Sequence, residues 1–138
     1  MIRLHHLGLL AAMAALPAAA QESACPPLPA GSQLQWQAQP GDGFLVCRAV
    51  DGERTVLGMM LTQQPTLDLK RRNREEQGSI GLHEVRWYQP EIAVDTGVRK
   101  RVTIVELGNN RYAQVWVDAA SDEELQRLLL MAEGIALH

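Results

Sequence analysis

The chain has 138 residues, of which 46% are hydrophobic, and 13 Lys and Arg residues against 16 Asp and Glu residues give a net charge of −3. This length suits one domain and is too short for two. The acidic excess argues against nucleic acid as a partner, because nucleic-acid-binding domains carry a basic excess.

The first twenty residues have the layout of a secretory signal. Arg3 supplies a positive charge, residues 7–16 form an uncharged apolar run, and Pro17 precedes the small residues 18–20. This order is typical of a cleavable signal peptide, and an apolar run of about ten residues is too short to span a bilayer. We expect residues 1–20 to be removed, leaving a periplasmic, secreted chain without a membrane span.

Cys25 and Cys47 are the only cysteines in the chain. In an oxidising compartment an even count favours a disulfide bond, and the separation of these two excludes a CxxC redox motif. We expect the bond to tie residues 21–43, a proline- and glycine-rich extended lead-in, to the first strand. A lipid on Cys25 is the weaker alternative, because Glu22 stands where a lipoprotein signal has a small or aliphatic residue.

The first predicted strands lie within the lead-in and directly after it. Residues 34–38 alternate and permit a short strand. Residues 44–50 and 53–62 are both strand-like and flank Asp51-Gly52, a dipeptide that favours a two-residue hairpin loop with positive φ at both positions. The apolar character of the first of these two strands on both faces predicts a central position in a sheet.

The middle of the chain is ambiguous. We predict a strand at 66–72 and a polar loop at 73–78, with a helix over 66–77 as the alternative. Residues 79–89 are expected to be extended, with a turn or bulge at Gly81, where the apolar alternation changes phase. Residues 90–97 are expected to form a loop.

A second hairpin is predicted near the C-terminus. Residues 101–107 are rich in β-branched side chains, residues 108–110 supply a turn, and residues 111–119 form the partner strand. This partner has two faces with different residues. One face is small and apolar (Ala113, Val115, Val117, Ala119), and the other carries Tyr112, Gln114, Trp116 and Asp118.

The last element is predicted to be an amphipathic helix. Ser121 and Glu124 form a capping box. Apolar residues then recur at helical spacing, namely Leu125, Leu128, Leu129, Ala132, Ile135 and Ala136. We expect this stripe to pack on the small face of 113–119. The fold class is therefore α+β: a single domain over residues 44–138 with two layers, a mainly antiparallel sheet of five to seven strands and one packed C-terminal helix.

The residues do not predict a catalytic, metal or cofactor site. His83-Glu84 begins like the zinc motif H-E-x-x-H, but Trp87 occupies the position of the second histidine. Gly78-Ser79 lacks the spacing of a serine nucleophile elbow. Paired carboxylates among Glu75, Glu76, Glu84 and Glu91 leave a hydrolase as an alternative.

One cluster favours an interaction surface. Eight basic residues lie between Lys70 and Arg101, interleaved with aromatic residues, and arginine with aromatic side chains is typical of protein interfaces. The candidate interaction residues are Arg71, Arg72, Arg74, His83, Arg86, Trp87 and Tyr88. The sequence thus predicts an exported, non-catalytic protein of the cell envelope that binds a protein partner, such as an inhibitor, immunity-type protein or accessory assembly factor. The alternative is a small periplasmic hydrolase that uses carboxylates.

Overall fold

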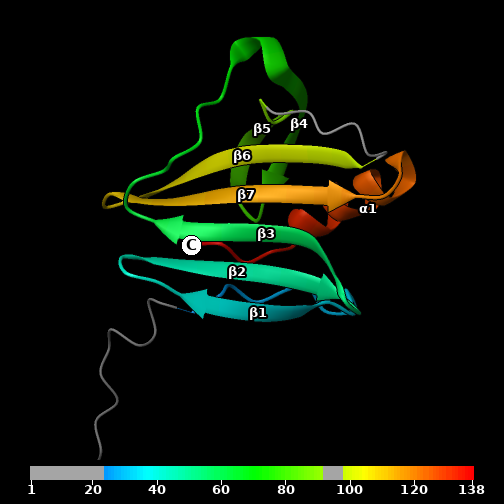
Figure 1. Ribbon diagram of the computed structural model, residues 1–138, viewed down its shortest axis with the longest axis horizontal. Helices are drawn as coiled ribbons and strands as arrows, with labels where there is room; N and C mark the ends of the chain where they lie inside the picture. Colours follow the sequence, from blue (N-terminus) through cyan, green and yellow to red (C-terminus); the bar gives the residue numbers. More distant parts are fainter. Residues whose placement is uncertain (1–23, 92–97) are drawn as a thin grey trace, which may run out of the picture.

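The computed structural model describes residues 24–91 and 98–138. Those residues form seven strands and one α-helix: β1 (Gln35–Pro40), β2 (Phe44–Asp51), β3 (Arg54–Thr62), β4 (Arg74–Ile80), β5 (His83–Tyr88), β6 (Arg99–Gly108), β7 (Arg111–Ala119) and α1 (Asp122–Ala132). The strands make one antiparallel sheet in the order β1-β2-β3-β7-β6-β5-β4 (Figure 1). The expected antiparallel sheet with a C-terminal helix is confirmed, whereas the expected signal at 1–20 lies outside the described residues.

The helix lies against one face of the sheet, behind β7 and β6 in Figure 1. The small face of β7 is completely buried there (Ala113, Val115, Val117, Ala119). Four residues of α1 are also buried: Leu125, Leu128, Leu129 and Ala132. The predicted stripe was too long at its end, because α1 stops at Ala132. Ile135 is buried from the tail beyond the helix, and Ala136 is exposed.

Both predicted hairpins form. Between β6 and β7 the loop is Asn109-Asn110, both with positive φ, as a type I′ turn requires. Between β2 and β3 the prediction was displaced by one residue. Asp51 pairs with Arg54, so the loop is Gly52-Glu53, and Gly52 has a φ of 63° while Asp51 stays in the strand.

The segment from 66 to 78 was predicted wrongly. Residues 63–70 form no strand, a 3-10 helix covers Arg71–Asn73, and β4 occupies the stretch expected to be a polar loop. The helical alternative over 66–77 is also wrong. The polar residues of β4 pair with β5, so backbone pairing at a sheet edge outweighs their low strand propensity. The turn expected at Gly81 is present, with a φ of 57°.

The β4–β5 hairpin leaves the plane of the other strands (Figure 1). Tyr88 opposite Val102 is the one pair in the strand register between β5 and β6 in the described residues, and Oγ1 of Thr103 in β6 donates to the carbonyl oxygen of Arg86 in β5 over 2.7 Å. At the far end of the hairpin, Nε2 of His83 donates to the carbonyl oxygen of Leu137 over 3.0 Å. The hairpin therefore folds toward the C-terminal tail and closes one side of the core.

The lead-in closes the opposite side. Cys25 is bonded to Cys47 in β2, with their Cα atoms 5.9 Å apart, which confirms the predicted disulfide. The carbonyl oxygen of Pro26 accepts a hydrogen bond of 2.6 Å from Nε1 of Trp36, and that of Pro27 accepts one of 3.4 Å from the backbone N–H of Ala136. Residues 25–27, near the start of the lead-in, thus connect β1, β2 and the C-terminal tail.

Candidate binding surface

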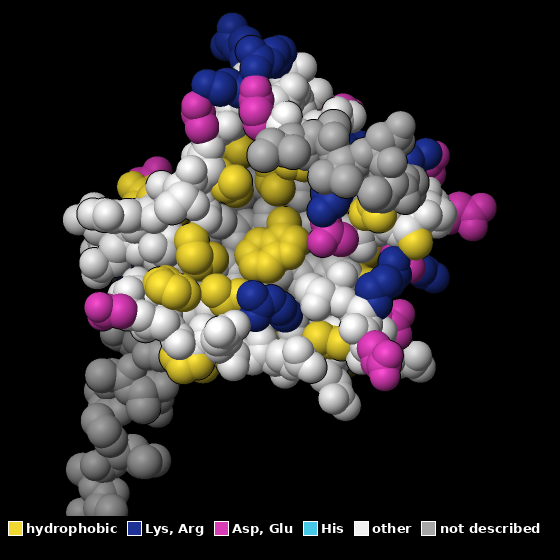
Figure 2. All heavy atoms as spheres, viewed as in Figure 1, with side chains coloured by type: hydrophobic (Ala, Val, Ile, Leu, Met, Phe, Trp, Pro, Cys, Tyr) yellow, Lys and Arg dark blue, Asp and Glu magenta, His cyan; other side chains and the backbone are white. Residues whose placement is uncertain are grey.

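The face of the sheet opposite α1 carries a group of partly exposed apolar side chains. Successive strand residues point to opposite faces. The residues of β7 that alternate with its buried residues therefore lie on this second face, here called the free face. It includes Val46, Met60, Ile104 and Trp116, all partly exposed. Figure 2 views the molecule from this side and shows hydrophobic side chains gathered over the middle of the sheet, with charged side chains around them.

One row of residues runs across all seven strands of the free face. Each member is paired with the next in the strand register. The row is Gln37, Arg48, Gly58, Trp116, Val102, Tyr88 and Arg74. Neighbouring strands are about 4.8 Å apart, so this cross-sheet row is a line of evenly spaced side chains. The stretch from Gly58 to Tyr88 is apolar and aromatic. Arg48 lies next to one end of this stretch and Arg74 next to the other.

Gly58 makes the centre of the row flat. A Cβ atom at this position would lie within 3.0 Å of three carbons of the Trp116 indole, Cζ2, Cε2 and Cη2. The ring therefore lies directly over the Gly58 backbone, in the space that a side chain would fill. Glycine weakens a strand interior unless it allows such a close approach. The indole is held against the sheet with its outer surface partly exposed.

Polar side chains are fixed around this ring. Nη1 of Arg48 donates to Oε1 of Gln39 over 2.9 Å, and Lys100 pairs with Asp118 at 3.4 Å. Among the described residues, Gln114 is the only deeply buried polar side chain on this face. Its Oε1 accepts hydrogen bonds from the backbone N–H groups of Thr66 and Leu67 (2.6 and 2.7 Å). The segment after β3 is thus tied across the free face, beside Trp116.

A groove of about 470 Å³ continues the free face at one end of the sheet. Its lining includes Phe44, Thr62 and Tyr112, which are paired with one another in the register. Phe44 is 42% exposed. The groove is also lined by Leu45 and Leu61, which pair in the register with Ala113 on the helix side of the sheet, so it lies at the end of the sheet between the two faces.

The residues predicted from the sequence as an interaction surface are not all brought together. Arg71, Arg72 and Arg74 lie at the exposed start of the β4–β5 hairpin, and Tyr88 is paired with Arg74. We call these three arginines the basic corner; Figure 2 shows Lys and Arg side chains projecting at the top of the molecule. Arg72 forms an ion pair with Glu91.

The other three predicted residues lie elsewhere. His83 is at the opposite end of the hairpin, bonded to the tail. Trp87 is 1% exposed and belongs to the core, where its Nε1 lies over Gly78. Nη1 of Arg86 donates to the carbonyl oxygen of Glu75 over 3.0 Å.

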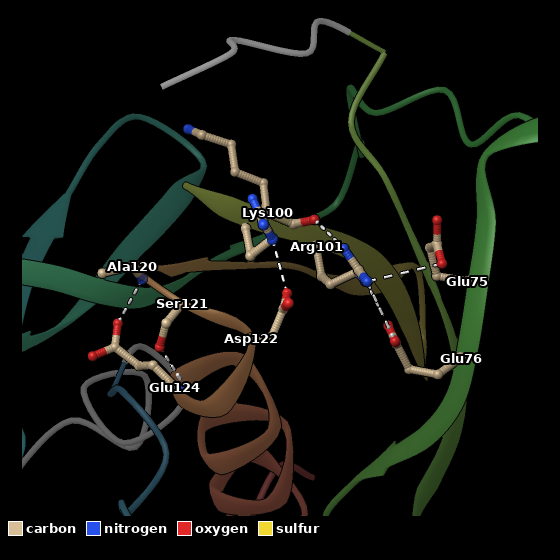
Figure 3. A network of polar contacts seen from close by, with 9 residues as sticks. Glu75, Glu76, Lys100, Arg101, Ala120, Ser121, Asp122 and Glu124 are labelled. Carbon is tan, nitrogen blue, oxygen red and sulfur yellow. Dashed lines mark hydrogen bonds and ion pairs between the residues drawn. The ribbon is translucent and has the colours of Figure 1, made fainter. Parts of the chain in front are cut away.

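The carboxylates singled out from the sequence mostly hold arginines. Arg101, whose side chain is 12% exposed, bonds Glu76 at 2.5 Å and approaches Glu75 at 3.8 Å (Figure 3). Both glutamates belong to β4, so this cluster attaches the edge of the sheet to β6. Glu84 is exposed on β5. In residues 24–91 and 98–138, no three His, Cys, Asp or Glu residues are grouped as metal ligands.

Among the described residues, one carboxyl has a clearly shifted pKa. The pKa of Glu124 is lowered because Arg54 hydrogen-bonds its carboxylate and the backbone N–H of Ala120 donates to it. The latter bond is 2.9 Å long (Figure 3). Ser121 Oγ in turn accepts from the backbone N–H of Glu124 over 3.1 Å. The predicted cap by Ser121 forms, but the carboxylate of Glu124 accepts from the backbone N–H of Ala120 where a capping box would use that of Ser121.

Sequence reasoning placed Trp116 on the face away from the helix but did not single it out. The signal that could have identified it is Gly58, a glycine inside an otherwise apolar strand. Within the described residues, no helix is long and apolar enough to cross a membrane. No family model, curated protein or solved structure matches this chain.

Proposed function

We propose that this chain is an exported, non-catalytic binding protein of the cell envelope whose partner is a periplasmic protein. In this role it is an inhibitor, an immunity-type protein or an accessory factor of an envelope assembly. The observation that carries the proposal is the seating of Trp116 on Gly58 at the centre of the free face.

The proposal treats the fold as two layers, a sheet and an amphipathic helix. Because α1 lies against the other face of the sheet, we infer that the side chains of the free face that stay partly exposed among the described residues, Val46, Met60, Ile104 and Trp116, contact the partner. Two antiparallel hairpins hold this face rigid. A rigid surface loses little conformational freedom on binding.

The composition of the free face supports a protein partner. Tryptophan, tyrosine, methionine and arginine are the residues enriched in the centres of protein interfaces. Trp116, Tyr88, Met60 and Arg48 provide one of each on this surface. The basic corner lies at the Arg74 end of the cross-sheet row, where electrostatic complementarity would speed association with an acidic partner.

Export rests on two features. Residues 1–20 have the pattern of a signal peptide, and the mature chain contains a disulfide bond, which is typical of oxidising compartments. The alternative, a small periplasmic hydrolase, has less support. The carboxylates nearest the predicted site engage arginines: Glu75 and Glu76 hold Arg101, and Glu91 holds Arg72.

The test is site-specific photo-crosslinking in the exporting cell. A photoreactive phenylalanine replaces Met60 on the free face or, as control, Leu130, which is 67% exposed on α1. We expect a discrete protein adduct from position 60 that is lost when Trp116→Ala is added, and none from position 130. Absence of an adduct at position 60, or the same adducts at both positions, would contradict the proposal.

A further inference from the structure

The two edges of the sheet differ in a way that bears on self-association. β1 forms one edge. Five of its six residues are exposed, and none of them carries a charge. An exposed edge strand presents unpaired N–H and C=O groups, and natural proteins usually block it with charges, bulges or a cover. Within residues 24–91 and 98–138, Pro40 at the end of β1 is the one such feature on this edge.

The opposite edge is protected. β4 contains Arg74, Glu75 and Glu76, and its pairing with β5 shifts register between Arg74 and Gln77. Charges and a bulge are the usual means of preventing edge-to-edge pairing. Charged side chains and a register shift thus mark β4, whereas β1 carries neither charges nor a register shift.

The peptide groups that β1 exposes can be assigned. The backbone N–H of Gly41 donates to the carbonyl oxygen of Phe44 over 2.8 Å across the β1–β2 turn. In an antiparallel pair, residues that bond their neighbour alternate with residues that face away. The odd-numbered residues of β1 therefore bond β2, and the peptide groups of Trp36 and Ala38 point outward.

We propose that β1 pairs in antiparallel fashion with β1 of a second copy of this chain, about a two-fold axis at Gln37. In this register Trp36 lies opposite Ala38 of the other copy, so the two outward pairs supply the hydrogen bonds. Gln35 then lies opposite Gln39, and Gln37 lies opposite itself.

The side chains of this strand suit a second copy. A glutamine amide is both a donor and an acceptor. Oε1 of Gln39 accepts from Arg48 of its own chain, so its NH2 group is the part that would donate to Gln35 of the other copy. The strand has no charge that a copy would repel, and the large Trp36 meets the small Ala38. A two-fold contact requires such a self-complementary surface.

The dimer is expected to be weak. Six residues on each side bury much less than the roughly 1,200 Å² typical of a stable interface. We expect sedimentation to show a monomer–dimer equilibrium at concentrations on the order of 100 µM. Gln37→Lys, which sets like charges opposite one another, should raise Kd by about five-fold or more. The matched control Gln77→Lys, on the protected β4 edge, should leave Kd unchanged.

Crosslinking tests the register directly. Gln37→Cys places the same residue on both sides of the axis, where side chains are closest, so it should give a disulfide-linked dimer on a non-reducing gel. Gln39→Cys on the same strand should give none, because it lies opposite Gln35. A purely monomeric chain at about 1 mM, equal crosslinking of both variants or an unchanged Kd for Gln37→Lys would overturn the proposal. Trp116→Ala should still dimerise, which separates this proposal from that for the free face.

Discussion

Replacing Gly58 by alanine tests the seating of the central indole. In the native protein the added methyl group must displace Trp116, because three ring carbons lie within 3.0 Å of the new Cβ. Overpacking of this kind costs about 1–3 kcal/mol. Alanine returns roughly 0.5–1 kcal/mol, since glycine is unfavourable inside a strand. We therefore expect Gly58→Ala to lower the free energy of unfolding by about 1–2 kcal/mol.

The second half of the experiment repeats this substitution in a Trp116→Ala background. With the ring absent, only the favourable effect of alanine in the strand remains, and Gly58→Ala should stabilise by about 0.5 kcal/mol. The sign of the change thus reverses, and the coupling energy between the two positions is roughly 2 kcal/mol.

Urea unfolding followed by far-ultraviolet circular dichroism measures all four proteins, with equal m-values required for the comparison. Equal destabilisation in both backgrounds, or a native-background Gly58→Ala as stable as the wild type, would contradict the seating of the indole on Gly58. Equal destabilisation would mean that the cost of alanine does not arise from the indole. An unchanged stability would mean that the indole moves off the sheet at little cost.

Three further predictions concern the frame around the free face. Removing the disulfide with Cys25→Ser and Cys47→Ser together should lower the free energy of unfolding by about 3 kcal/mol, and a loss under 1 kcal/mol in urea titration would contradict this. Arg101→Met leaves two glutamates of β4 without their partner and should cost about 1–2 kcal/mol, with faster amide hydrogen exchange in β4 than in β2; unchanged β4 exchange would argue against the anchoring role. For Glu124, the folded pKa is below the unfolded value near 4.5, so its stabilisation is complete above that pH and is lost as pH falls through the folded pKa. Glu124→Gln should therefore flatten the loss of stability below pH 4.5, and parallel pH profiles would contradict the assignment.

Turn chemistry made much of the fold predictable. Asn109 and Asn110 adopt the positive φ that their turn requires, and the cap by Ser121 fixes the start of α1. The two cysteines were also sufficient to predict their bond. In these cases the local sequence and the tertiary structure favour the same conformation, which is the condition under which local reasoning succeeds.

The prediction failed where tertiary contacts decide the conformation. Glu75 and Glu76 have low strand propensity, yet they lie in β4 because β5 supplies the backbone pairing and Arg101 neutralises their charge. The candidate surface failed for a similar reason. Spacing along the sequence grouped Trp87 with the basic residues, but strand alternation and the fold of the hairpin bury it. The cross-sheet row joins all seven strands, and its members are far apart in the sequence.

The Kd for the partner tests most directly whether the free face is the site of partner binding. Once the crosslinked partner is purified, calorimetric titration should compare the wild-type chain with Trp116→Ala and with the control Leu130→Ala. An anchor at the centre of an interface contributes at least about 2 kcal/mol, so Trp116→Ala should raise Kd by roughly thirty-fold or more, while Leu130→Ala should leave it unchanged. Equal Kd values for Trp116→Ala and the wild type would contradict the account.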